Sequence, residues 1–212
     1  MLIGAAGVVS FVGGGLHPES QDGLSFRDSL VAMMEGSTWV PGHALLAVGS
    51  ALFLAGLLIV RRTGAWSASG HALRFAIGAT VFNTLELVFH TVAVVDKDAL
   101  AGGDWPPIAT LHLGLAVVAY PLFGAAIVWL AWRLLKSWNL FLRVFSVLGI
   151  VGGIANALAA PLTILLRNPE YAFLFPIGGI GISLWLTVVG LVGPRQELLS
   201  SSKAERHVSV NG

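Results

Sequence analysis

Residues 107–132, PIATLHLGLAVVAYPLFGAAIVWLAW, form a run without a single charged side chain. As a helix, this run would be about 39 Å long, which exceeds the roughly 30 Å hydrocarbon core of a bilayer. An uninterrupted apolar run longer than about 18 residues is typical of a membrane-spanning helix rather than of a helix buried in a soluble domain. The run therefore predicts a transmembrane helix.

The composition extends this prediction to the whole chain. The 212 residues are 56% hydrophobic and 11% charged, whereas a soluble domain is roughly 25% charged. Five further apolar stretches lie at 2–16, 40–60, 72–95, 141–166 and 171–192. Each should be helical, because unpaired backbone groups are too costly in lipid. We therefore predict an all-α, polytopic membrane helix bundle with about six transmembrane helices, of which 2–16 is short for a full span.

The loop charges predict the orientation of the bundle. Nine of the 12 lysines and arginines fall on one side of the predicted membrane: Arg61, Arg62, Arg74, Arg133, Lys136, Arg143, Arg195, Lys203 and Arg206. Arg27, Lys97 and Arg167 fall on the other side. Because positive loops stay in the cytoplasm, we expect a multi-pass protein of the cell membrane with both termini cytoplasmic.

Two segments outside the spans also carry a pattern. Apolar residues in the first outer loop repeat at the spacing of one helix face, at Phe26, Leu30, Met33 and Met34. Ser25 and Asp28 stand where a capping box would begin this helix, so we predict a short amphipathic helix that lies over the outer end of the bundle. Residues 1–195 form a single transmembrane domain in this interpretation, and the polar, Ser-rich residues 196–212 form a disordered cytoplasmic tail.

Four of the six histidines fall on the outer side, each near the end of a different predicted helix. His43 and His112 lie near the beginnings of their helices and His90 near the end of its helix, and His17 directly follows the first apolar stretch. Antiparallel helices would bring these four rings to a similar depth. Imidazole binds Zn, Cu, Fe and Ni, and also haem iron.

Glu86 is the one carboxylate inside a predicted span, one helical turn before His90. A charged group there costs about 2.5–3.5 kcal/mol, so it is expected to face the bundle interior and to serve a function. We therefore predict a transition-metal site (Fe, Cu or Zn) made by His43, His90, His112, Glu86 and His17, with redox chemistry as its use. Glu86 would be a ligand, the partner of a ligand or the catalytic proton acceptor.

A b-type haem is the alternative cofactor, held by His43 with His90 or His112. Small residues at Gly42, Gly49 and Gly114 would then leave room for the macrocycle.

Two other functions remain open at this point. Glu86 and His90 could relay protons in a proton-coupled transporter or channel subunit. The chain could also be a non-catalytic subunit of a larger membrane complex or a homo-oligomer. A net charge of +1 gives no indication of nucleic-acid binding, and the absence of cysteine excludes thiolate metal sites. Because the predicted helices are apolar on their outer faces, we expect the lipid bilayer to be the main partner.

Overall fold

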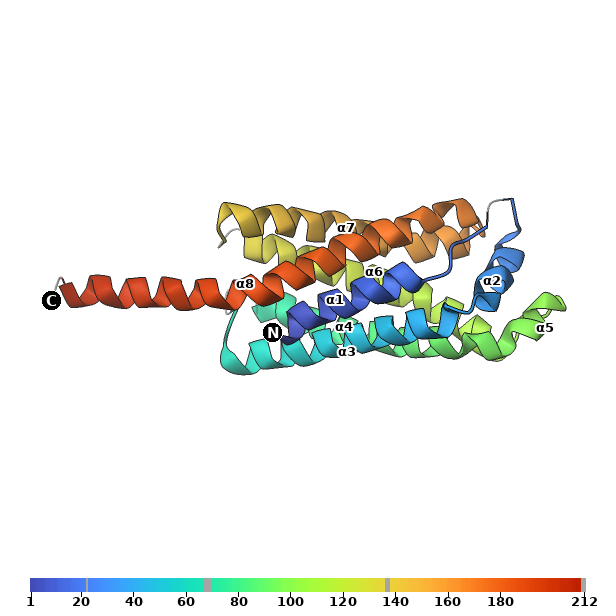
Figure 1. The fold of residues 1–212 in the computed structure, drawn as a ribbon, viewed down its shortest axis with the longest axis horizontal. Coiled ribbons are helices and arrows are strands. Elements are labelled where there is room, and N and C mark those ends of the chain that lie inside the picture. The colour runs from blue at the N-terminus through green and yellow to red at the C-terminus, as the bar shows by residue number, and fades with distance from the viewer. Residues whose placement is uncertain (22, 67–69, 136–137, 211–212) are drawn as a thin grey trace.

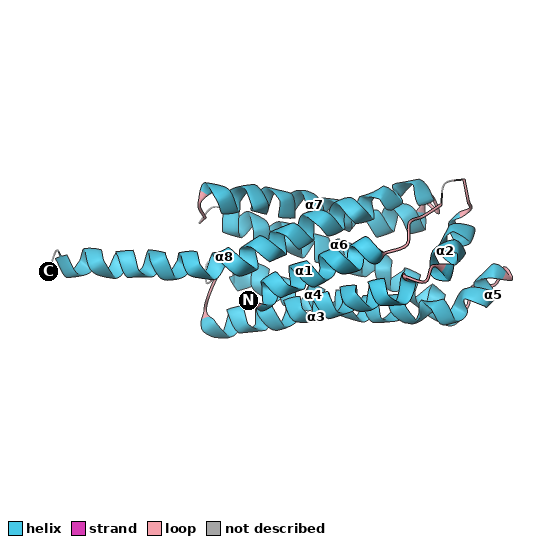
Figure 2. Cartoon of the chain, in the orientation of Figure 1, coloured by secondary structure: helices cyan, strands magenta, loops and turns pink. Residues whose placement is uncertain are grey.

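The computed structural model describes residues 1–21, 23–66, 70–135 and 138–210, with side chains up to Gly193. The helices are α1 (Leu2–Leu16), α2 (Phe26–Glu35), α3 (Trp39–Thr63), α4 (Gly70–Val92), α5 (Lys97–Ala101), α6 (Pro107–Leu135), α7 (Leu140–Leu165) and α8 (Leu174–Val210). Two short 3₁₀ helices, η2 (Ala93–Asp96) and η3 (Pro169–Phe173), precede α5 and α8. The described residues contain no strand, so the predicted all-α class is confirmed (Figure 2).

Five helical segments are long and apolar enough to cross a membrane: Trp39–Thr63, Gly70–Ala101, Pro107–Leu135, Leu140–Leu165 and Pro169–Gly193. Their outward faces are apolar as well; on α7, for example, Val147, Val151 and Ile154 are each about half exposed. Such surfaces are stable against lipid and not against water. The prediction of a polytopic membrane protein is therefore confirmed. A sixth crossing by α1, which has 15 residues, remains a prediction.

The six long helices form a closed ring in chain order. α1 packs against α3, α3 against α4, α4 against α6, α6 against α7, α7 against α8, and α8 returns to α1. Successive helices run in opposite directions, so the two termini lie toward one end of the bundle and α2 and α5 lie at the other (Figure 1). We call the second end the α2 end.

Glycines allow α1 to sit between its two neighbours. A Cβ atom at Gly7 would collide with the backbone of Ser183 in α8, and one at Gly13 would meet the carbonyl of Gly42 in α3. Small residues at such crossings bring helix backbones into van der Waals contact, which is the main attraction between helices in lipid. The shortest apolar helix is thus held tightly within the ring.

The predicted helix of the first loop is present as α2. The Ser25 hydroxyl accepts a hydrogen bond from the Asp28 N–H, as expected of an N-cap. Leu30 and Met34 are buried against Trp39, α5 and the beginning of α6. Hence α2 covers its end of the bundle.

α8 continues beyond the other helices to Val210 (Figure 1). α8 therefore includes most of residues 196–212, for which the sequence predicts a disordered tail. A helix without neighbours has no tertiary packing to stabilise it, and the disordered tail remains a prediction.

Candidate functional site

Four imidazoles form a row at the α2 end. They come from four helices that are neighbours in the ring: His17 caps α1, and His43, His90 and His112 belong to α3, α4 and α6. Ring centroids are 4.6 Å apart for His17 and His43, 4.0 Å for His43 and His90, and 3.9 Å for His90 and His112. The structure therefore brings together the histidines that the sequence singled out.

Helix direction explains this convergence. His43 lies four residues after the first residue of α3 and His112 five after the first of α6, whereas His90 lies two before the last residue of α4. At 1.5 Å per residue these positions differ in depth by only about 5 Å. Because the three helices alternate in direction, positions near a beginning and near an end lie at the same level.

Backbone carbonyls orient two of the rings. Nδ1 of His43 donates to the Trp39 carbonyl at 2.7 Å, and Nδ1 of His17 donates to the Pro18 carbonyl at 2.7 Å. A carbonyl can only accept a hydrogen bond, so the proton is on Nδ1 in both rings. In the neutral ring this leaves the Nε2 lone pair available.

Glu86 orients the other two rings in the same way. Its Oε1 lies 3.1 Å from Nδ1 of His90 and 2.9 Å from Nδ1 of His112, and the side chain is completely buried. A carboxylate that accepts from both Nδ1–H groups again leaves each Nε2 with a lone pair. The four rings thus share one arrangement, in which Nδ1 is bonded to an oxygen and Nε2 forms no hydrogen bond with the described residues.

Several buried polar atoms of this cluster have no hydrogen-bond partner among the described residues: Nε2 of His43, Oε2 of Glu86 and Nε1 of Trp39. Such atoms are rare in folded proteins, and an ion or an ordered water is a common explanation. Three orphan atoms in one cluster indicate that the cluster has capacity for a ligand.

Ligand atoms are close enough for a metal ion in two overlapping groups. One group is His17, His43 and His90, and the other is Glu86, His90 and His112. Within each group, one donor atom of each residue lies within 4.8 Å of the others. His90 belongs to both groups, which places it at the centre of the arrangement.

Burial lowers the pKa of His17, although its hydrogen bond to Pro18 acts in the opposite direction. His17 stands just outside the apolar helix α1, and it is only partly buried. Its imidazole is therefore neutral near pH 7, with its lone pair available to a cation.

Trp39 takes a different position from the one the sequence indicates. Its place at the beginning of a span is typical of an interfacial aromatic belt, but only 1% of its surface is exposed. The indole lies 4.3 Å from the His43 ring and 5.1 Å from the His90 ring, measured between centroids. The first turn of α3 faces inward beneath α2, so Trp39 closes the cluster from that side. Trp105, Trp129 and Trp132 are exposed, as a belt requires.

Polar side chains continue inward from Glu86. Asn83, one turn deeper on α4, donates to Ser50 of α3 at 3.2 Å, and Ser50 shares a hydrogen bond of 2.8 Å with Thr84. Asn83 lies three residues before Glu86 on the same face of α4, as helix spacing indicates. Ser50 and Thr84 carry no comparable signal in the sequence, because single hydroxyls are common in membrane helices.

Helix α7 contributes a separate polar contact. Asn156 donates to the Tyr120 carbonyl of α6 at 3.2 Å, and the buried Thr163 hydroxyl has no hydrogen-bond partner in the described part of the chain. Asn156 thus joins two helices and does not reach the imidazole row.

Comparison with protein families, with curated proteins and with solved structures finds no match to this chain.

Proposed function

We propose that this protein binds one transition-metal ion at the α2 end of its bundle, through Nε2 of His17, His43 and His90. The observation that carries the proposal is the common arrangement of the rings, each with Nδ1 bonded to an oxygen. Histidines that ligate metals almost always donate their other N–H to a carboxylate or a carbonyl, which fixes the ring and makes it a better donor.

The second group of donors fits less well as the primary ligand set. Nδ1 of His90 and Nδ1 of His112 are already engaged with Oε1 of Glu86. An ion between these three atoms would have to replace both hydrogen bonds, whereas an ion at the Nε2 side would leave them in place. Glu86 and His112 therefore act next to the ligands rather than as ligands. Glu86 accepts the hydrogen bond from Nδ1 of His90 and so fixes the orientation of that ring.

Charge balance supports the same assignment. In its ionised form Glu86 would be an anion inside an apolar bundle, and its hydrogen-bond partners among the described residues are two imidazoles. Uncompensated buried charge is expensive. A bound cation one imidazole away would supply the missing positive charge.

The glycines that would make room for haem serve other purposes. Gly42 and Gly49 face α1, where added Cβ atoms would meet Gly13 and Ser10, and Gly114 has no neighbour within 4 Å. The His43 and His90 rings, 4.0 Å apart between centroids, also leave no gap for a macrocycle. Axial ligands on opposite sides of a haem iron need roughly 6 Å between ring centroids, given metal–nitrogen bonds of about 2.0 Å. These contacts favour a metal ion over haem.

Imidazole ligands suit Fe, Cu and Zn, and the first two would supply redox chemistry. Three histidines leave a coordination position open, as in catalytic rather than structural sites. Since His17 lies beyond the last residue of α1 and is only partly buried, we place the open position toward the end of the bundle, beneath α2. The loop charges put this end outside the cell and both termini in the cytoplasm.

A second candidate function, proton-coupled transport, draws on the polar side chains below Glu86. Asn83, Ser50 and Thr84 extend the polar surface inward from Glu86 by about one helical turn. In that case Glu86→Gln would abolish pH-driven flux in proteoliposomes. Unaltered flux in this variant would refute a role of Glu86 in proton-coupled transport.

Metal titration of the apo-protein in detergent tests the proposed site. We expect His17→Ala to weaken Zn²⁺, Cu²⁺ or Fe²⁺ binding by at least 100-fold, because a ligand is lost, and His112→Ala to weaken it about tenfold, because only support is lost. His71→Ala, on an exposed histidine at the opposite end, is the control. Loss of metal in the His112 variant with retention in the His17 variant would assign the ion to the other group.

A further inference from the structure

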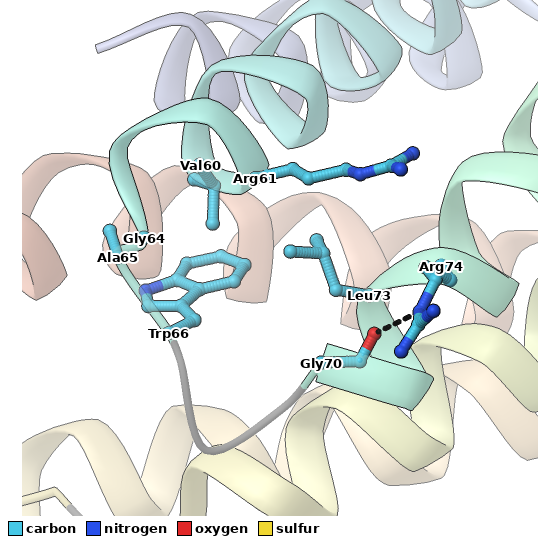
Figure 3. A pocket seen from close by; sticks show the side chains of 8 residues that line it. All are labelled: Val60, Arg61, Gly64, Ala65, Trp66, Gly70, Leu73 and Arg74. Atoms are coloured by element: carbon cyan, nitrogen blue, oxygen red, sulfur yellow. Dashed lines mark hydrogen bonds between the residues drawn. The ribbon is translucent and has the colours of Figure 1, made fainter.

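A pocket of about 260 Å³ lies at the opposite end of the bundle, between the end of α3 and the beginning of α4. Its apolar wall includes Val60, Trp66 and Leu73, and its two charged members are Arg61 and Arg74. Figure 3 shows both guanidinium groups on the far side of Leu73 from Trp66, with that of Arg74 turned toward Gly70. The imidazole row takes no part in this pocket.

Burial separates the pocket into two regions. Trp66 and Leu73 are 4% and 5% exposed, whereas Arg61 and Arg74 are exposed. Nε of Arg74 donates to the Gly70 carbonyl at 3.4 Å, which holds this side chain along the beginning of α4. An apolar floor with a cationic rim matches a ligand that has an anionic group joined to an apolar part.

No acid balances the charge of this rim among the residues whose side chains the structure describes. From residue 36 to residue 95 the one carboxylate is Glu86, which lies about 18 Å along α4 from Arg74. Among the described residues, no carboxylate forms an ion pair with either arginine. Both arginines stand at the ends of membrane-spanning helices, at the depth of lipid headgroups.

We propose that this pocket binds the headgroup of an anionic phospholipid. Arg61 and Arg74 would contact the phosphate, since guanidinium groups bind phosphate oxygens in pairs. The glycerol end of an acyl chain would lie against Val60 and Leu73. A direct ion pair between an exposed arginine and the phosphate contributes about 1 kcal/mol, which corresponds to roughly fivefold in affinity for each arginine.

The experiment follows thermal unfolding of the full chain in detergent micelles by tryptophan fluorescence, with added phosphatidylglycerol or phosphatidylcholine. We expect phosphatidylglycerol alone to raise the unfolding temperature. Arg61→Gln and Arg74→Gln should each weaken its apparent affinity about fivefold. Arg62→Gln is the matched control, because this neighbouring exposed arginine does not line the pocket; its affinity should stay within about twofold of the parent, since diffuse charge falls off with distance.

Three outcomes would overturn the proposal. Equal stabilisation by the two lipids would show that charge is not recognised, and an Arg62→Gln loss as large as that of Arg61→Gln would show diffuse attraction only. Stabilisation by inorganic phosphate as strong as that by phosphatidylglycerol would mean that the site takes free phosphate. Arg61→Lys, which keeps the charge but loses the planar fork, should be intermediate and guards against an effect of misfolding.

Discussion

Replacing Glu86 by glutamine tests how the site is supported without removing a metal ligand. The side chain keeps its volume, and its carbonyl oxygen can still accept from His90 and His112. What the variant cannot carry is the negative charge that an ionised carboxylate would place beside the two rings. At the position of Oε2, which has no partner, the variant places an N–H₂ group that also lacks an acceptor.

The expected effect follows from the contacts. Two charge-assisted hydrogen bonds, of 3.1 and 2.9 Å, become neutral ones of about half the strength. Losing a partner behind metal-ligating histidines typically weakens metal affinity 10- to 100-fold, or about 1.4–2.7 kcal/mol. The unfolding temperature of the apo-protein should not fall, because a buried anion has been removed.

Co²⁺ titration of the apo-protein, followed by visible absorption and checked against a competing chelator, gives the dissociation constant. Glu35→Gln is the matched control, since Glu35 is an exposed carboxylate at the same end of the bundle. A dissociation constant for Glu86→Gln within threefold of the parent would refute the supporting role of Glu86. Complete loss of binding with an intact fold would instead make Glu86 a ligand.

Three further predictions concern the scaffold. Ser25→Ala should destabilise α2 by about 1 kcal/mol, because the N-cap hydrogen bond is lost. Amide hydrogen exchange in α2 and release of the metal should then both be faster. Unchanged exchange would show that Ser25 does not hold α2 over the end of the bundle. Gly7→Val should lower the unfolding temperature by the equivalent of about 1–3 kcal/mol, whereas Gly14→Val, with open space around its Cβ, should not; equal effects would mean that α1 is not packed as described. Asn156→Ala should lower the free energy of unfolding by about 0.6–1 kcal/mol, because the hydrogen bond to the Tyr120 carbonyl is lost. The metal affinity should stay unchanged, and a change in affinity would show that this contact is coupled to the metal site.

Much of the scaffold could be predicted because lipid permits few solutions. The uncharged run at 107–132 had to be helical, and the structure places a helix there from Pro107 to Leu135. The cap at Ser25 and the apolar spacing that follows it likewise identified α2. Both inferences rest on local physics, in which the relevant groups lie within a few residues of one another.

The site itself depends on packing that spacing does not encode. Depth along each helix indicated that His43, His90 and His112 lie at one level, but the rotation of each helix decides which rings touch. His17 lies outside the first apolar stretch, and the packing of α1 against α3 brings its ring centroid to 4.6 Å from that of His43. The inward position of Trp39 depends on α2 lying above it, which a pattern in α3 alone cannot show.

Metal content measured together with an absorption spectrum on one detergent-purified sample shows whether the imidazole row holds a metal ion. We expect about one equivalent of Fe, Cu or Zn in the parent protein, without the Soret band of haem. We expect less than about one tenth of an equivalent in the folded double variant His43→Ala, His90→Ala, because two ligands are lost. A parent protein that stays metal-free after incubation with each ion, or a double variant that keeps its metal, would rule out the proposed site.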